Sequence, residues 1–373
     1  MLTAFDDYPI HQAGVPIAHT GSSDLNFYDR YFFNGYNRSG STVAPLYFGV
    51  ALGLYPNRHV SDAAFSVVRG DEQLSVFASG RAPLDRSLAT TVGPIRVEIV
   101  EALHIIDVFV DAPQQGLRAE LRFTSRSRAI EEPHFFQRIG VRTFFDYTRL
   151  TQFGGWSGWI EIDGDRTEVS SVEFCGSRDR SWGIRPVGEA APTGAPVGEP
   201  QFFWLWAPVN FATLATHFDV NEYGDGRRWH EVGAVALDGN EAAMMRSVDY
   251  RIEWEPGSRW ARSFSYDLID WNGEVHTVSM VPVATFMMRG IGYGHPERTH
   301  GRWLGEAVVA GERITLPVAN PCDRDTVHIQ ALCTAEYRRP DGSIEVGTGI
   351  LEQLALGVHP TGLTGLLDPY VAP

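Results

Sequence analysis

The stretch that decides the fold is "WARSFSYDLIDWNGEVHTVSMVPV", residues 260–283. Apolar and polar side chains alternate on both sides of Asn272-Gly273, as they do in strands that bury one face. An Asn-Gly dipeptide between two such runs is a strong signal for the tight turn of a β-hairpin. The stretch therefore predicts two antiparallel strands.

The same alternation recurs along the chain. It occupies residues 95–112, 117–125 and 158–169, with turns rich in Gly and Pro between the runs. Convincing amphipathic helices are nearly absent from the sequence. Many short strands separated by such turns are typical of sandwiches and barrels. We therefore predict an all-β protein with antiparallel sheets.

The length of the chain favours two domains. At 373 residues it is long for a single hydrophobic core. Residues 186–200, "PVGEAAPTGAPVGEP", are rich in Pro, Gly and Ala and contain no aromatic residue, as expected of a linker. We predict two β-barrel domains at residues 1–190 and 191–373. The alternative is a long loop inside one sheet.

Composition and charge narrow the class of partner. The formal net charge is −15, which disfavours nucleic acid and anionic membranes as partners. No run of about 18 uncharged apolar residues predicts an integral membrane segment, and the first residues lack the features of a signal peptide. Three cysteines without C-x-x-C spacing fit reduced thiols. We therefore expect a cytoplasmic location. Ten Trp, thirteen Tyr and twenty-one Phe favour half-buried strands and an apolar ligand cavity.

Familiar cofactor motifs are incomplete. "GGWSG" at residues 154–158 lacks the spacing of a nucleophilic serine. "RGIGYGHPE" at residues 289–297 lacks the spacing and the following helix of a nucleotide loop. His295 and His300 fall on opposite faces if their segment is a strand, so we predict hydrogen-bonded histidines over a cavity mouth rather than a metal site. We expect no cofactor and no metal.

The segment "CGSRDRSWGIRP", residues 175–186, combines charges with an indole. In a strand, alternation places Asp179 on one face and Arg178 and Arg180 on the other. Burial beside indoles would raise the pKa of Asp179, whereas a neighbouring guanidinium would lower it. The alternative is a strand end with a surface Arg-Asp pair and a tryptophan that faces the core.

At this segment the chain resembles a known group of proteins. "GSRDRSWGIRP" is similar to the D-H-[NS]-W-G segment of the carotenoid 1,2-hydratase and AttH group of lipocalin-like proteins. "GGWSGWIEIDG", "YGHPERTHGRWLGE", "GTGILEQ" and "FYDRYFFNGYN" resemble further landmarks of the group, in the same order along the chain. The resemblance implies two lipocalin-like antiparallel barrels with an elongated apolar cavity.

The resemblance also implies a reaction. The hydratases of this group add water to an isolated alkene of a terpenoid, with the aspartic acid of the motif as proton donor and no cofactor. Asp179 falls on that aspartate, but Arg180 stands where the group has histidine, and Ser177 where the carotenoid hydratases have tyrosine. Both differences put the substrate in doubt.

The expected chemistry assigns roles to further residues. A carboxylic acid kept neutral in an apolar site can protonate an alkene, and aromatic faces can stabilise the resulting carbocation. His217 is a candidate partner for the attacking water. The candidate wall residues are Trp156, Trp159, Trp182, Trp204, Trp206 and Trp303, together with His295 at the cavity mouth.

We therefore expect a cofactor-independent, acid-catalysed hydratase or dehydratase that acts on a hydrophobic isoprenoid or polycyclic small molecule. One alternative is a non-catalytic carrier of a lipid or aromatic ligand, in which Asp179 only anchors the fold. Another is a cyclase or isomerase that uses the same cavity to fold its substrate. Replacing Asp179 separates an enzyme from a carrier.

Overall fold

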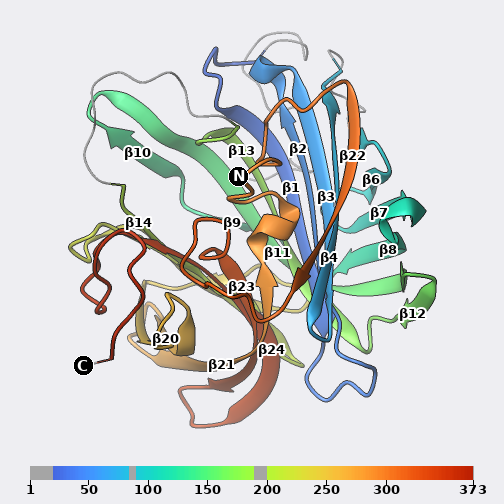
Figure 1. Cartoon of the computed structure of the whole chain (residues 1–373). Coiled ribbons are helices and arrows are strands. Elements are labelled where there is room, and N and C mark those ends of the chain that lie inside the picture. The colour runs from blue at the N-terminus through green and yellow to red at the C-terminus, as the bar shows by residue number, and fades with distance from the viewer. Residues whose placement is uncertain (1–19, 84–89, 189–199, 373) are drawn as a thin grey trace.

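The computed structural model describes residues 20–83, 90–188 and 200–372. They form two large antiparallel sheets and three 3-10 helices of one turn, so the predicted all-β class is confirmed (Figure 1). The hairpin expected around Asn272-Gly273 is present, because Ile269 pairs with Val275 across the turn. The 3-10 helices are η2 (Pro56–Arg58), η3 (Pro113–Gln115) and η4 (Met288–Ile291).

The larger sheet, sheet A, has fourteen strands in the order β22-β4-β3-β2-β1-β13-β11-β8-β7-β6-β5, and β9, β10 and β12 also pair with β11. Its strands are β1 (Phe27–Asn37), β2 (Tyr47–Tyr55), β3 (Val60–Arg69), β4 (Glu72–Arg81), β5 (Thr91–Val92), β6 (Ile95–Glu101), β7 (Ile105–Ala112), β8 (Leu117–Ser125), β9 (Ile130–Glu131), β10 (Phe135–Ile139), β11 (Arg142–Ile162), β12 (Asp165–Val169), β13 (Phe174–Ile184) and β22 (Ala307–Thr315).

The second sheet, sheet B, has ten strands in the order β18-β17-β16-β14-β24-β23-β21-β20-β19, and β15 pairs with both β16 and β24. Its strands are β14 (Phe202–Trp206), β15 (Val209–Asn210), β16 (Leu214–Glu222), β17 (Arg228–Leu237), β18 (Ala243–Met244), β19 (Ser247–Trp254), β20 (Ala261–Ile269), β21 (Val275–Met287), β23 (Ile329–Arg338) and β24 (Ile344–Leu356).

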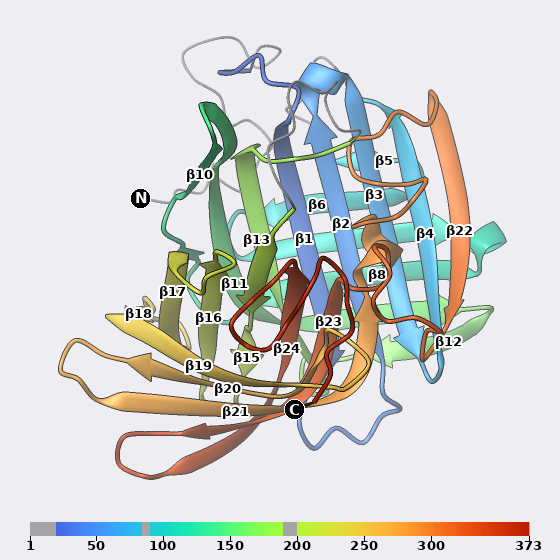
Figure 2. The same cartoon turned by 60° about the vertical axis from the view of Figure 1, so that its left-hand side comes forward.

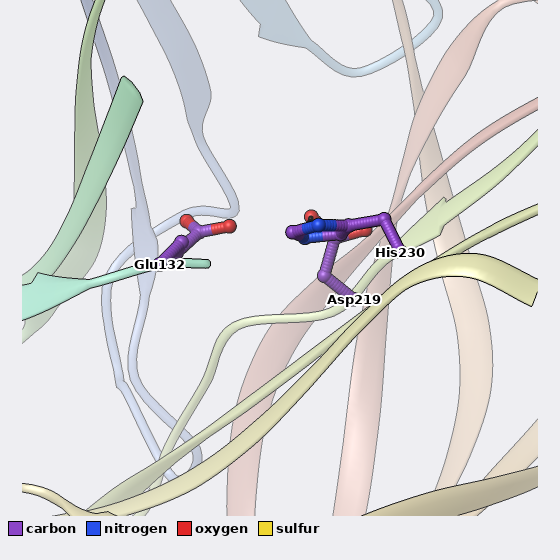
Figure 3. Close-up of side chains that lie close together, drawn as sticks. All are labelled: Glu132, Asp219 and His230. Atoms are coloured by element: carbon purple, nitrogen blue, oxygen red, sulfur yellow. Dashed lines mark ion pairs between the residues drawn. The ribbon is translucent and has the colours of Figure 1, made fainter. Parts of the chain in front are cut away.

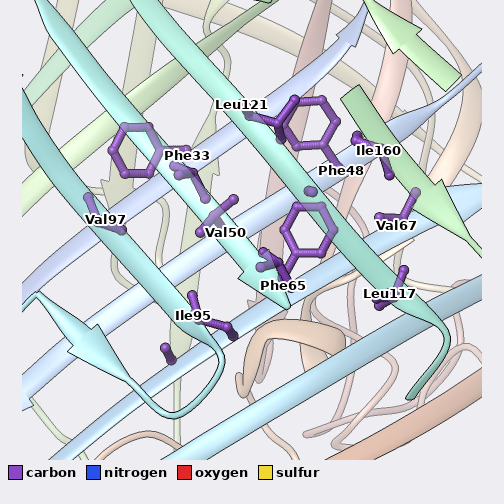
Figure 4. Close-up of a cluster of buried hydrophobic side chains, with 14 of the residues drawn as sticks. Phe33, Phe48, Val50, Phe65, Val67, Ile95, Val97, Leu117, Leu121 and Ile160 are labelled. Carbon is purple, nitrogen blue, oxygen red and sulfur yellow. The ribbon is translucent and has the colours of Figure 1, made fainter. Parts of the chain in front are cut away.

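Each sheet curls around its own hydrophobic core. In sheet A, β6 to β8 cross behind β1 to β4, and the apolar side chains of both layers meet between them (Figures 2 and 4). Sheet B curls in the same way, because Met245 beside β19 donates its backbone N–H to Gly233 of β17. A Cβ on Gly233 would lie 2.4 Å from Val248, so glycine permits this close approach.

The two sheets pack against each other through their outer faces. A third apolar cluster fills this contact and joins Phe32 and Tyr47 of sheet A to Trp206, Phe286 and Ile350 of sheet B. We call this contact the inter-sheet face. Buried charges of both sheets, Arg149 of sheet A and Asp219 of sheet B among them, meet at this face.

Strands β1 to β13 belong to sheet A, and the strands from β14 onward belong to sheet B with one exception. Strand β22 follows in the C-terminal half of the chain but pairs with β4 at the edge of sheet A. Most of the predicted linker, residues 189–199, lies outside the described residues. No helix among the described residues is long and apolar enough to cross a membrane.

Candidate active site

Asp179 lies on the inter-sheet face. It belongs to β13, where its cross-strand neighbours are Phe32 of β1 and Thr151 of β11. Phe32 contacts the indole of Trp206 in sheet B, with 6.3 Å between the ring centroids. The side of β13 that carries Asp179 is therefore turned toward sheet B.

The two neighbouring arginines point to the other side of β13, as strand alternation predicts. Arg180 forms a buried ion pair with Asp29, and its guanidinium lies 4.3 Å from the centre of the Tyr31 ring inside sheet A. Arg178 donates from Nε to Gln152, at 2.9 Å. Within the described part of the chain, no hydrogen bond or ion pair links Asp179 to either arginine.

The environment of Asp179 favours its neutral form. Burial raises the pKa of its carboxyl to about 6, against the lowering effect of the charges on Arg149, Arg185 and Arg30. Glu352 of sheet B raises the pKa further. The side chain still keeps part of its surface accessible, unlike its neighbours in β13 from Phe174 to Arg178 and at Arg180. Asp179 is thus an acid that can be protonated and reached.

A network of buried charges stands beside Asp179 and joins the two sheets. Arg149 of β11 donates to Glu132, at 2.9 Å from Nε and 2.5 Å from Nη2, and also pairs with Asp219 of β16. Thr151 donates to Glu132 at 2.6 Å. Figure 3 shows the Glu132 carboxylate facing Asp219 and His230, which come from sheet B. The network therefore bridges sheet A to sheet B.

The two carboxylates of this network differ in their proton affinity. Burial acts to raise the pKa of both. At Glu132 the interactions with Arg149 and His217 outweigh burial, so its pKa falls well below the usual range. At Asp219 burial and the Glu132 charge outweigh Arg149, so its pKa is raised. Burial lowers the pKa of His230 to about 3, and this ring is neutral near pH 7.

The same three residues have the composition of a metal site. Glu132, Asp219 and His230 offer ligand atoms that lie within 4.8 Å of one another, the one such group among the described residues. However, Nη2 of Arg149 binds both carboxylates and takes the position between them that a cation would need. The residues therefore fit an ion-pair network better than a metal site.

Aromatic residues of sheet B border this network. The indole of Trp204 donates to Asp219 at 2.9 Å, and the Arg149 guanidinium lies 5.7 Å from the Trp204 ring and 5.9 Å from the Trp206 ring. His217 packs against Trp206, and its Nε2 lies 3.5 Å from Glu132. The structure thus brings Asp179, His217, Trp204 and Trp206 to the same inter-sheet face.

The remaining residues predicted from the sequence lie elsewhere. Trp156 is fully buried in the core of sheet A, where it donates to the carbonyl of Asn34 at 2.8 Å. Trp182 is on the side of β13 that carries Arg180, whose guanidinium lies 5.7 Å from its ring. Trp159 stacks under Arg166 at the end of β11, and Trp303 is 45% exposed beside Arg81.

His295 is buried in the loop after η4. Its Nδ1 accepts hydrogen bonds from the backbone N–H groups of Glu297 and Arg298, at 3.0 and 2.9 Å, and its ring contacts Phe77. His300 is buried on the same loop, and burial lowers its pKa to about 3. Nδ1 of His300 lies 3.9 Å from the carboxylate of Asp62 in β3, so both histidines help to hold the loop against sheet A.

Several charged residues of the site were missed by the sequence reading. They are Arg30, Glu132, Arg149, Arg185 and Asp219, all within or beside segments rich in aromatic residues. A single arginine inside a strand such as "FYDRYFFNGYN" is a usable signal, because a buried strand seldom carries a charge without a purpose. Which charges meet across the two sheets depends on packing that no local pattern contains.

The comparisons with known proteins support the fold. The structure is similar to a crystal structure of a protein from Nitrosomonas europaea provisionally identified as AttH, with a TM-score of 0.54 and 13% sequence identity. The match covers 88% of this chain and 93% of that chain, and at this identity it confirms the AttH-like fold alone. No curated protein matches the chain.

The family comparison covers nearly the whole sequence. The model described as "Family of unknown function (DUF8625)" matches residues 2–364. The chain therefore belongs to this family of unknown function, DUF8625.

Proposed function

We propose that the protein is a cofactor-independent enzyme that adds water to an alkene of a hydrophobic isoprenoid or polycyclic molecule, or removes it, with Asp179 as the acid. One observation carries the proposal. Asp179 is accessible and has no arginine partner among the described residues, and burial raises the pKa of its carboxyl to about 6. A general acid requires such a carboxyl, because an ion-paired aspartate would have given up its proton.

The residues of the inter-sheet face supply the other parts of the reaction. Asp179 transfers its proton to one alkene carbon, and the adjacent carbon becomes a carbocation. The indoles of Trp204 and Trp206 lie at the same inter-sheet face and would stabilise that charge. Water then attacks the cation and gives up a proton, for which His217 is the proposed acceptor. The products are a neutral alcohol and, after proton return, the restored Asp179 acid.

The likeness to an AttH-like fold supports this proposal at the level of architecture. The motif resemblance at Asp179 supports it at the level of the residue. The two alternatives, a carrier of a lipid or aromatic ligand and a cyclase or isomerase, would use the same inter-sheet face. They differ from the hydratase in whether water enters the product.

The test is to incubate the purified protein with an acyclic isoprenoid alkene in isotopically labelled water. We expect an alcohol that carries the labelled oxygen. Asp179→Asn should lower the rate by about 10² to 10⁴-fold while the variant remains folded. Asp165→Asn is the matched control, since this aspartate is 75% exposed on the surface and should turn over at the normal rate.

Other outcomes separate the alternatives. An isomeric product without labelled oxygen would favour the cyclase or isomerase. Bound ligand without product, together with unchanged binding by Asp179→Asn, would contradict catalysis and favour the carrier.

A further inference from the structure

The guanidinium of Arg30 is buried and has no hydrogen-bond partner among the described residues. Arg30 lies on β1 with 1% of its surface exposed, and none of its three side-chain nitrogens finds an acceptor among the described residues. Its guanidinium lies 4.5 Å from the centre of the Tyr293 ring. A buried charge is costly unless an opposite charge or hydrogen-bond acceptors compensate it.

A second arginine lies against the same tyrosine. Arg185, just after β13, donates to the Tyr293 hydroxyl at 3.1 Å, and its guanidinium lies 5.7 Å from the Tyr293 ring and 4.6 Å from the Tyr28 ring. It keeps part of its surface accessible. No carboxylate forms an ion pair with Arg185 in the described ranges of the chain. Two guanidinium groups therefore surround one phenol ring without an acidic partner.

Two other buried arginines of sheet A have acidic partners. Arg149 is paired with Glu132 and Asp219, and Arg180 is paired with Asp29. The charges of Arg30 and Arg185 lower the pKa of Asp179, but in the described part of the chain no ion pair joins Asp179 to either arginine. The positive charges of Arg30 and Arg185 beside Asp179 are therefore not balanced by an ion-paired carboxylate in the described part of the chain.

We propose that Arg30 and Arg185 bind the oxyanion group, carboxylate or phosphate, of an amphiphilic ligand. A planar guanidinium can donate two parallel hydrogen bonds to such a group. We place the hydrocarbon part between the two sheets, against the buried apolar cluster that contains Phe32, Trp206 and Phe286. The inference rests on the proposed function only in placing that hydrocarbon beside Asp179. It names the substrate class as an isoprenoid acid or phosphate rather than a neutral hydrocarbon.

The test compares three ligands that share one isoprenoid chain: farnesoic acid, farnesyl phosphate and farnesol. Binding is measured by calorimetry and by tryptophan fluorescence. We expect the acid or the phosphate to bind at least about tenfold more tightly than the alcohol, and the tighter of the two identifies the oxyanion. Equal affinity for all three, or no binding, would overturn the proposal.

Variants localise the effect. Arg30→Met should remove the preference for the anionic ligands and should leave the melting temperature unchanged or higher, because it deletes a buried charge without a partner. Arg185→Gln alone should weaken the preference. Arg30→Lys should keep part of it, because lysine retains the positive charge but cannot donate two parallel hydrogen bonds to the oxyanion. Arg251→Met, a surface arginine that is 67% exposed, is the control and should bind like the unaltered protein.

The stability readout separates a binding role from a structural one. Loss of stability in Arg30→Met with an unchanged preference would show that Arg30 only supports the fold. The binding test and the turnover test can fail separately. If Asp179→Asn kept normal turnover, the hydratase proposal would fail, but a preference for anionic ligands would still support the oxyanion site. The opposite result is also informative. If Asp179→Asn lost turnover but the unaltered protein showed no preference for anionic ligands, the hydratase proposal would stand and the oxyanion site would be refuted.

Discussion

Arg149 and Arg30 occupy equivalent positions on one face of sheet A. Both are buried cross-strand neighbours of Ser181, Arg149 from β11 and Arg30 from β1. Arg149 is bound by two carboxylates, whereas no acceptor lies within reach of Arg30 among the described residues. The same side chain in the same row of the sheet therefore serves two purposes, one to join the sheets and the other to meet a ligand.

The comparison also explains where Asp179 stands. It lies one row away from both arginines, between Phe32 and Thr151. Arg149 is neutralised by the carboxylates of Glu132 and Asp219, whereas Arg30 has no carboxylate partner among the described residues. Asp179 thus lies between two groups of charges. One is the balanced half, Arg149 with Glu132 and Asp219, and the other is the positively charged half, Arg30 and Arg185. A substrate bound at Asp179 would contact both.

The largest expected effect on stability comes from breaking the ion pairs of Arg149 in the balanced half. Arg149→Met should lower the free energy of unfolding by about 3 to 5 kcal/mol, because it leaves the carboxylates of Glu132 and Asp219 buried without their cation. Urea unfolding measures this loss. Arg122→Met, which breaks a surface pair with Asp107, should leave the free energy of unfolding nearly unchanged, because solvent screens that pair. A similar small cost for both variants would contradict the structural role of Arg149.

The next effect is a pH dependence centred on Asp179. Because its pKa is raised from 3.8 to about 6, the folded protein keeps this proton to a higher pH than the unfolded chain does. The contribution of this group to stability is therefore full below about pH 4 and is lost as the pH rises to about 6. The loss is at most about 3 kcal/mol, since each pKa unit corresponds to about 1.4 kcal/mol.

Asp179→Asn cannot ionise and should avoid that loss. We expect the variant to match the unaltered protein at about pH 4 and to be more stable than it at about pH 7. Urea unfolding at the two pH values measures the difference. If the variant were instead less stable at about pH 7, Asp179 would be an ionised and stabilising group, and its role as an acid would be refuted.

A smaller effect is expected at Trp204, at the edge of the balanced half. Its indole N–H donates to the carboxylate of Asp219 at 2.9 Å, so Trp204→Phe should cost about 1.5 kcal/mol in urea unfolding. Trp271 is the matched control, because its indole also donates a hydrogen bond but the side chain is 73% exposed. Equal losses of stability in Trp204→Phe and Trp271→Phe would show that the hydrogen bond to Asp219 stabilises the protein no more than an exposed indole hydrogen bond does.

Local sequence patterns predicted what depends on neighbouring residues in the chain. Alternation and the Asn272-Gly273 turn gave the strand class, and the alternation of "SRDRSW" gave opposite faces to Asp179 and Arg180. The pairing of β22 with β4 and the meeting of Arg149 with Asp219 could not be predicted. Both join segments far apart in the chain, and the hydrogen bonds and charges involved carry no local signal.

The tryptophans show the same limit. Trp156 and Trp206 are both fully buried and look alike in the sequence, yet one fills the core of sheet A and the other lies on the inter-sheet face. Period-two alternation states that two residues of a strand face opposite ways. It does not state which of those ways leads to a core and which to a second sheet.

The smallest expected effect is at Trp303, which the sequence suggested as a wall residue. Its side chain is 45% exposed and stacks against Arg81, which in turn pairs with Glu306 on the surface. Trp303→Ala should therefore change the free energy of unfolding by no more than about 0.5 kcal/mol and should leave the affinity for farnesoic acid unchanged. Trp206→Ala, on the inter-sheet face, should weaken the same affinity. If Trp303→Ala weakened it as much, the ligand would extend to the edge of sheet A, and the binding site would not be confined to the inter-sheet face.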